Sequence, residues 1–281
     1  MASCYGSISS PLAGAASDRA SCLPIRTALP DGTRVEIDVF RESEHEAGHQ
    51  LLNQVIEEAR EFGKLAIGLS WPFEETLDLG GFRGYFLSHA AFVVRAIPSH
   101  TDTTSDTIAE TSAGDSGDKN LEEKSNDEVS EAAREAAVAG GSFSERPPAA
   151  GERSSGEKDD GAVKVWGAFY IKPNFPGRCS HVCNGGFITD PRRRRRGVAR
   201  LMGHAFLRLA RDLGYKASYF NLVFRSNEAS VRLWRGLGFK ELAVVPKAGR
   251  LKGIDGLVDA IQFYYDLENL RNEDLPDDVR A

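Results

Sequence analysis

The sequence predicts an α/β (α+β) fold, because segments with the period of a β-strand are followed by segments with the period of an α-helix. Residues 33–40 alternate between apolar and polar side chains, as in a half-buried strand, and residues 51–62 place apolar side chains at helical spacing. The same order recurs at 185–213 and at 217–238. Repeated strand-to-helix units favour a sheet that is flanked by helices.

The N-terminal part of the chain contains a leader and the first structured segment. Residues 1–29 are expected to be a disordered leader, since they are rich in Ser and Ala and show no strand or helix period. An organelle transit peptide has a similar composition, so that alternative stays open. Residues 30–98 are expected to begin the folded domain with the strand and helix described above, followed by an interruption at Gly80-Gly81 and a buried strand at 90–96.

An acidic insertion separates the two parts of the predicted domain. Residues 99–160 contain 16 acidic and 6 basic side chains and carry a charge of −10, so the remainder of the chain, whose total is −6, carries +4. With one Phe and little other apolar material, this segment cannot bury enough surface to fold and is expected to be disordered. The strand at 90–96 should pair across it with a strand at 163–171. The second part of the domain is expected at 161–272, with a tail at 273–281.

Composition restricts the location of the protein. The chain is 41% hydrophobic and 27% charged, and no stretch approaches the roughly 20 apolar residues that cross a bilayer, so no membrane partner is expected. The four cysteines have no secretory signal ahead of them and do not indicate a disulfide framework. We therefore expect a cytoplasmic protein, with the organelle as the alternative.

An arginine-rich loop joins the strand that ends at residues 185–190 to the helix that follows. Apolar side chains at three- and four-residue spacings from Val198 to Leu213 form one wide face, and Gly214 follows at the C-cap position. Because backbone N–H groups at a helix start bind anions, this loop suits a pyrophosphate. The five arginines at 192–196 would by themselves equally fit a nuclear localisation signal, a nucleic-acid patch or a solvated helix start.

Two spacings in this half of the chain resemble the signatures of one enzyme family. Arg194-x-x-Gly197-x-Ala199 resembles the acetyl-CoA loop of GNAT N-acetyltransferases. The helix at 226–239, which Ser226 or Asn227 is placed to cap, resembles their second signature. Both occur in the order found in the family.

The resemblance implies the GNAT fold, with a mixed, mostly antiparallel central sheet flanked by helices and central strands that splay where acetyl-CoA inserts. It also implies acetyl-CoA as the co-substrate, no metal, and direct transfer of the acetyl group to an amine. The residues implied to bind the cofactor lie on the strand end, the loop and the starts of the two helices: Phe187, Ile188, Thr189, Arg194, Arg195, Arg196, Gly197, Val198, Ala199, Arg200, Asn227 and Ser230.

One position departs from the family pattern. Many GNAT enzymes have a Tyr where this chain has Trp234, and the Tyr hydroxyl protonates the departing CoA thiolate. The indole N–H of Trp is not a practical proton source for a thiolate. Water, Asn227 or another group must therefore meet the thiolate.

Further motifs resemble a fungal GNAT subfamily that acetylates azetidine-2-carboxylate, a toxic proline analogue. They are FYIKPN at 169–174, RCSHVCN at 178–184, FNLVF at 220–224, VPKAG at 245–249 and VDAI at 258–261. This resemblance implies acetyl transfer to the ring nitrogen of azetidine-2-carboxylate, cis-4-hydroxyproline or a related proline-pathway intermediate. It also implies roles for the matching residues: Asn184, assisted by Arg178, would bind the substrate carboxylate, and Asn221 with the backbone amide of Leu222 would form an oxyanion hole.

The sequence offers no strong general base and no metal site. His181, in a run expected to be extended, and His204, on the polar side of its helix, are candidates by type, and a water relay is favoured over both. Cys179, His181 and Cys183 lie on one short run whose side chains should alternate between faces, so they do not form a zinc site.

Two alternatives remain beside the small-molecule acetyltransferase. The enzyme could acetylate a protein amine or another small amine, such as an aminoglycoside. The chain could also be a non-catalytic module whose arginines bind nucleic acid and whose acidic insertion tethers a partner. We favour the small imino acid as partner over nucleic acid and expect a homodimer by analogy with the subfamily.

Overall fold

The computed structural model describes residues 20–61, 75–97, 165–251 and 253–280. All of the described residues belong to one compact unit. The predicted acidic insertion at 99–160 and the first part of the predicted leader, 1–19, lie outside the described residues.

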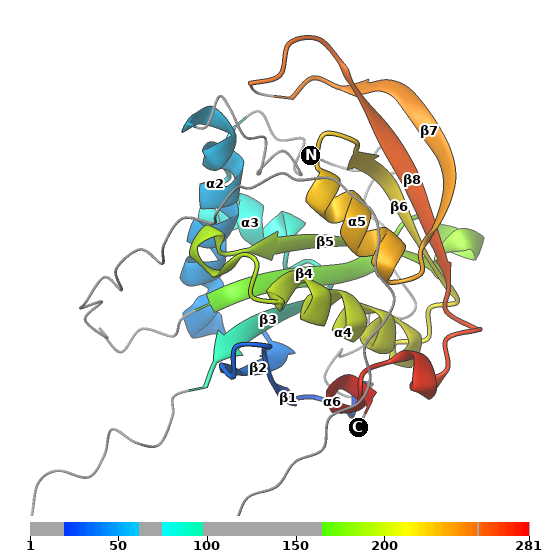
Figure 1. Cartoon of the computed structure of the whole chain (residues 1–281). Helices are drawn as coiled ribbons and strands as arrows, with labels where there is room; N and C mark the ends of the chain where they lie inside the picture. The colour runs from blue at the N-terminus through cyan, green and yellow to red at the C-terminus, as the bar shows by residue number, and fades with distance from the viewer. Residues whose placement is uncertain (1–19, 62–74, 98–164, 252, 281) are drawn as a thin grey trace, which may run out of the picture. The chain divides into compact units, whose positions relative to one another are not determined.

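Within the described residues, eight strands form one sheet in the order β1-β2-β3-β4-β5-β6-β8-β7 (Figure 1). The strands are β1 Ile25–Ala28, β2 Arg34–Val39, β3 Ala90–Ala96, β4 Val165–Pro173, β5 Val182–Thr189, β6 Ala217–Phe224, β7 Lys240–Gly249 and β8 Val258–Asp266. All neighbouring pairs are antiparallel except β5 and β6, which run parallel. The predicted mixed, mostly antiparallel sheet is confirmed, and so is the predicted pairing of strands 90–96 and 163–171, which are β3 and β4.

Helices cover both faces of this sheet. The α-helices are α2 His45–Glu61, α3 Leu79–Tyr85, α4 Val198–Asp212, α5 Glu228–Gly236 and α6 Asp277–Arg280, and the 3-10 helices are η1 Glu42–Glu44, η2 Gly177–Cys179, η3 Pro191–Arg193 and η4 Asn272–Asp274. Helices α4 and α5 lie on one face of the sheet and α2 and α3 on the other (Figure 1). Their buried side chains belong to two separate core clusters. No helix in the described part of the chain is long and apolar enough to span a membrane.

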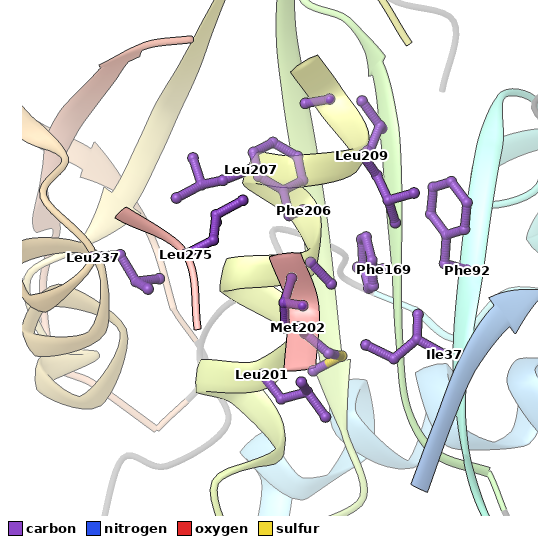
Figure 2. Packing of buried hydrophobic residues seen from close by; sticks show 14 of the residues in the cluster. Ile37, Phe92, Phe169, Leu201, Met202, Phe206, Leu207, Leu209, Leu237 and Leu275 are labelled. Atoms are coloured by element: carbon purple, nitrogen blue, oxygen red, sulfur yellow. The ribbon is translucent and has the colours of Figure 1, made fainter. Parts of the chain in front are cut away.

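The larger core lies between α4 and the sheet. Figure 2 shows the α4 side chains Met202 and Phe206 at its centre, with Phe169 of β4 beside them. Leu237, which follows α5, and Leu275, near the C-terminus, approach from the other side of α4. The apolar stripe that the sequence places on residues 198–213 is therefore buried on more than one side of the helix, by the sheet and by segments distant in sequence.

The opposite face of the sheet has a smaller core under α2 and α3. Phe82 and Phe86 are fully buried there and stack with ring centroids 5.4 Å apart. Asp78 caps α3 by accepting a hydrogen bond of 2.6 Å from the N–H of Gly81. The pair Gly80-Gly81, which we expected to interrupt the chain, therefore opens a short helix, because the cap and the burial of two Phe rings outweigh the low helix propensity of glycine.

A buried ion cluster ties β2 and β3 to η1. Arg95 of β3 is 4% exposed and makes a two-pronged ion pair with Glu44, whose side chain is fully buried; Arg95 Nη2 lies 2.8 Å from Glu44 Oε2. Arg95 Nη1 also contacts Glu36 at 3.1 Å and Asp38 at 3.3 Å. Burial raises the pKa of Glu44, but hydrogen bonds from Arg95 and from the Arg41 N–H outweigh it, and the net pKa of this carboxyl is lowered.

Two predictions at the chain ends are wrong. Residues 25–28, placed in a disordered leader, form β1 and pair antiparallel with β2. The tail predicted at 273–281 contains α6, and its Leu275 and Val279 are buried against α4. Both segments are too short to show a period in sequence, and their order depends on surfaces supplied by β2 and α4.

Candidate functional site

The two parallel strands at the centre of the sheet separate soon after they meet. The β5–β6 register contains only Val182 opposite Ala217 and Cys183 opposite Ser218. Beyond these pairs β5 continues to pair with β4 on its other side, as far as Thr189. The facing edges of β5 and β6 therefore diverge, as the family resemblance predicted, and backbone groups along this opening are available to a ligand.

The loop that leaves β5 is anchored by one buried carboxylate. Asp190 is 2% exposed, and its N–H donates to the carbonyl of Trp166 on β4 at 3.0 Å. Its Oδ1 accepts from the N–H of Arg192 at 2.9 Å and from Arg192 Nε at 3.1 Å, while Oδ2 accepts from Arg192 Nη2 at 2.9 Å. This bidentate pair determines how the chain enters η3 and the following loop.

Left-handed backbone at the end of the loop forms an anion-binding geometry. Arg195 has φ of 61° and Gly197, the N-cap of α4, has φ of 94°. Gly197 supplies no side-chain cap, so the N–H groups of the first turn of α4 are not satisfied by a capping side chain. Since these N–H groups carry the positive end of the helix dipole, the arrangement fits a pyrophosphate.

Not all the loop arginines point their charge toward such an anion. The guanidinium groups of Arg193 and Arg196 lie over the Trp166 ring, 4.7 Å and 5.1 Å from its centroid. Arg196 Nε also pairs with Asp31 at 2.7 Å. Arg196, predicted to bind the cofactor, is therefore already held by a carboxylate and a ring, which gives it a structural function in the loop.

The other predicted cofactor residues differ in which of their atoms face the opening. Ile188 and Val198 are 2% and 1% exposed with side chains packed in the cores, so only their backbone groups can serve a ligand. Thr189 and Ala199 are half-buried, Arg194 is half-buried beside η3, and Arg195 and Arg200 are exposed.

The second predicted cofactor segment is the start of α5. Asn227 caps this helix, because its Oδ1 accepts from the N–H of Ser230 at 3.1 Å. The cap positions the Asn227 amide at the helix start, and a bond from Asn227 to the cofactor stays a prediction.

Aromatic side chains pack at the base of the opening. Trp234 lies 4.8 Å from Phe187 of β5 and 4.7 Å from Phe220 of β6, measured between ring centroids. Trp234 also packs against Phe239 at 5.4 Å and is 5% exposed. Trp234 thus joins α5 to both diverging strands as a packing residue.

Of the two predicted carboxylate-binding residues, one lies at the opening. Asn184 directly follows the last β5–β6 pair, and its Oδ1 accepts from the N–H of Gly185 at 2.8 Å. This bond orients the amide and leaves the Nδ2 donors for a ligand. Arg178 is in the exposed turn η2, and within the described residues no hydrogen bond or ion pair joins it to Asn184.

The two predicted oxyanion residues lie in an irregular part of β6. The register with β8 shifts between Phe220 and Val223, so Asn221 and Leu222 are outside it. Asn221 and Asn174 exchange two amide hydrogen bonds, of 2.6 Å and 3.1 Å. These bonds fix the Asn221 side chain and use one of its two N–H donors, which leaves the second for a ligand. The sequence indicated Asn174 only as part of a motif, and this positioning contact was not predicted.

Sequence reasoning missed a group of residues on the face of the sheet that carries α2 and α3. Tyr170 and Lys172 lie two residues apart on β4, so both side chains face this side of the sheet. Tyr85 of α3 contacts both of them. Lys172 Nζ lies 4.4 Å from the centroid of the Tyr85 ring and 4.6 Å from that of Tyr170, and the two hydroxyls are 3.2 Å apart. Burial raises the pKa of both phenols and lowers that of Lys172. The Tyr170 and Lys172 spacing was visible in the sequence, but the contact with Tyr85 was not.

The candidate bases and the cysteines lie apart from this group. His204 is on α4 with Asp278 of α6 nearby, and burial, then the Arg200 charge, lower its pKa. His181, expected in an extended run, instead sits in an exposed turn where its Nδ1 contacts the Arg178 carbonyl at 3.1 Å. Cys179 is exposed, whereas burial raises the pKa of the Cys183 thiol to about 12. Within the described residues no three His, Cys, Asp or Glu side chains are grouped to hold a metal.

Comparisons with known proteins agree with this geometry. Residues 134–239 match the model of the acetyltransferase (GNAT) family. The N-acetyltransferase aca1 of Schizosaccharomyces pombe is 48% identical over 113 residues, which are 40% of this chain and 54% of that protein. Protein SPT10 of Saccharomyces cerevisiae is 34% identical over 97 residues, which are 34% of this chain and 15% of that protein. The chain thus spans about half the length, or less, of these curated relatives.

Solved structures show the same fold at low sequence identity. A GCN5-related N-acetyltransferase from Kribbella flavida has a TM-score of 0.53 and 16% identity, over 83% of this chain and 97% of that chain. YncA from Salmonella typhimurium, solved with its cofactor acetyl-CoA, has a TM-score of 0.50 and 13% identity, over 84% of this chain and 95% of that chain. These neighbours show that the fold is the predicted GNAT fold. The match of residues 134–239 to the family model is consistent with an acetyltransferase.

Proposed function

We propose that this chain is an acetyl-CoA-dependent N-acetyltransferase that acts on a small imino acid of the proline-analogue class. The observation that carries the proposal is the divergence of β5 and β6 beside a loop whose left-handed residues, Arg195 and Gly197, open α4 without a side-chain cap. In this arrangement the pyrophosphate of the cofactor would accept hydrogen bonds from the first turn of α4. Its pantetheine arm would lie in the opening between the strands.

The transfer itself needs alignment more than a strong acid or base. A cyclic secondary amine, once deprotonated, attacks the thioester carbonyl carbon; the C–S bond then breaks, the thiolate leaves and the amine proton passes to water. The second N–H of Asn221 and the backbone N–H of Leu222 would donate to the carbonyl oxygen as it gains negative charge. The Asn174 pair supports this role, since it holds the Asn221 amide in one orientation.

The proposed substrates are L-azetidine-2-carboxylate and cis-4-hydroxyproline. Motif resemblance supports the choice, and so does Asn184, whose Nδ2 donors lie where the strands begin to separate. Arg178 is the weaker candidate for the carboxylate, since its turn is exposed.

Thiol release from acetyl-CoA tests the function. Purified protein is mixed with acetyl-CoA and azetidine-2-carboxylate, with cis-4-hydroxyproline, proline and a lysine peptide in parallel. We expect release with the proline analogues, loss of that release in Asn184→Ala, and normal release in Asn269→Ala, a change to an exposed amide. Turnover of the peptide without turnover of any imino acid would replace this proposal with protein acetylation.

A homodimer and a cytoplasmic location complete the proposal. The edge strand β7 exposes Leu242 and Val244, at 55% and 48%, and such an edge favours contact with a second copy. Light scattering of the purified protein tests the dimer, and imaging of a C-terminally tagged full chain tests the location.

A further inference from the structure

Lys172 and Asn184 face the same side of the sheet at the point where the opening begins. They are directly opposed in the antiparallel β4–β5 register. Opposed residues in such a pair have Cβ atoms about 4.5–5.5 Å apart, so both side chains can reach one small group. Asn184 is also the first β5 residue beyond the last pair with β6. A ligand at the opening therefore meets both side chains.

The charge of Lys172 has no anionic partner in the described part of the chain. No hydrogen bond or ion pair involves its ammonium there; its close contacts are the two rings of Tyr85 and Tyr170, at 4.4 Å and 4.6 Å. Lys172 is half-buried, so its ammonium keeps only part of its contact with water. The rings attract the cation, but they do not replace the hydrogen bonds that it loses. Burial accordingly lowers the pKa of Lys172.

An anion bound beside Lys172 would supply the partner that its ammonium lacks. A carboxylate placed between the two strands would accept from Lys172 Nζ and from Asn184 Nδ2, and the charge-assisted bond is of the stronger kind. A second cation would bind less well at this position, because the Lys172 ammonium repels it. The position therefore favours amines that carry a carboxylate and disfavours polyamines.

We propose that Lys172 and Asn184 together form a carboxylate-binding subsite, walled by Tyr85 and Tyr170, and that the substrate is a small amino or imino acid. This inference deepens the proposed function and rests on it. Lys172 is a specificity-determining residue, distinct from the groups that stabilise the reacting carbonyl.

Calorimetric titration of azetidine-2-carboxylate into the protein with bound CoA tests the subsite directly. Azetidine-2-carboxamide is the matched probe without the negative charge. In Lys172→Met we expect binding of the acid to weaken by about 10- to 100-fold, with binding of the amide changed by less than about twofold. Lys172→Arg should retain most of the affinity for the acid, and Lys240→Met, a change on exposed β7, should match the wild type.

Kinetics separate this role from a general base. The subsite predicts that Lys172→Met raises KM for the acid and leaves kcat and its pH profile nearly unchanged. A loss of kcat for acid and amide alike, with the pH-dependent limb removed, would overturn the proposal in favour of a base.

The titration also separates the subsite from the proposed function. Since titration reports binding of the acid itself, a wild type that binds the acid through Lys172 without acetylating it retains the subsite and loses the proposed function. A wild type that acetylates another amine and does not bind the acid refutes the subsite.

Discussion

Replacement of Gly197 by Ala tests whether the left-handed start of α4 is what holds acetyl-CoA. Gly197 has φ of 94°, and a Cβ at this position would lie 2.9 Å from Cδ of Pro30 and 3.3 Å from its Cγ. The left-handed conformation costs an L-residue about 1–2 kcal/mol. Relief of the contact with Pro30 adds about 1–2 kcal/mol, at the lower end for overpacked sites. We therefore expect the free energy of unfolding to fall by about 2–4 kcal/mol.

The same change should weaken cofactor binding, because strain at Gly197 is relieved by moving the loop and its N–H groups. We expect the Kd for acetyl-CoA to rise by about 10-fold or more, measured by calorimetry, with stability measured by urea unfolding. Gly256→Ala is the matched control: Gly256 has φ of 84° and a Cβ there would meet no atom within 4 Å, so only the cost of about 1–2 kcal/mol applies and acetyl-CoA binding should not change. Equal stability loss in the two variants, with unchanged acetyl-CoA affinity in Gly197→Ala, would show that the left-handed start of α4 does not hold the cofactor.

Three further predictions concern buried groups. Arg95→Met leaves the fully buried Glu44 without its partner and should lower the free energy of unfolding in urea by about 3–5 kcal/mol. Arg26→Met removes an exposed ion pair with Glu36 and should lower it by at most about 1 kcal/mol. Similar losses in the two variants would contradict the argument from burial. The folded-state pKa of Glu44 lies below its ordinary value of 4.5, so its contribution to stability is complete above pH 4.5 and is lost as the pH falls through the lowered pKa. Glu44→Gln should therefore flatten the acid side of the plot of unfolding free energy against pH. Iodoacetamide at about pH 8 should modify exposed Cys179 and spare buried Cys183, whose pKa is about 12, with fragment mass spectrometry as the measurement; equal labelling of the folded protein would contradict this.

Periodicity predicted those elements whose buried side chains recur at regular spacing within one stretch of the sequence. The apolar stripe from Val198 to Leu213 indicated α4, and its bounds, Val198–Asp212, agree within a residue. The helix predicted at 51–62 is α2, which begins earlier, at His45, because η1 and the Glu44 ion pair order the preceding turn. The loop between β5 and α4 was recognised because its glycine and arginine spacing has a chemical meaning that is independent of the rest of the fold.

The candidate site was only partly predictable. Residue types at motif positions indicated Asn184, Asn221 and Asn227, but the sequence left open whether Ser226 or Asn227 caps α5 and did not show that Arg196 is held by Asp31. Such contacts depend on the direction in which a side chain points in the folded protein. A motif gives only the position of the residue along the chain.

What the sequence alone determined is the strand–helix units at 185–213 and 217–238, the arginine loop between β5 and α4, and the family resemblance. Each of these follows from residues that are neighbours along the chain. Tertiary structure decided which distant residues meet: Tyr85 with Tyr170 and Lys172, and Asn174 with Asn221. The spacing of apolar residues shows which side of a helix or strand is buried, but it does not show which other element packs against that side. Partners across the sheet follow from strand order, register and helix placement, which the whole chain determines together.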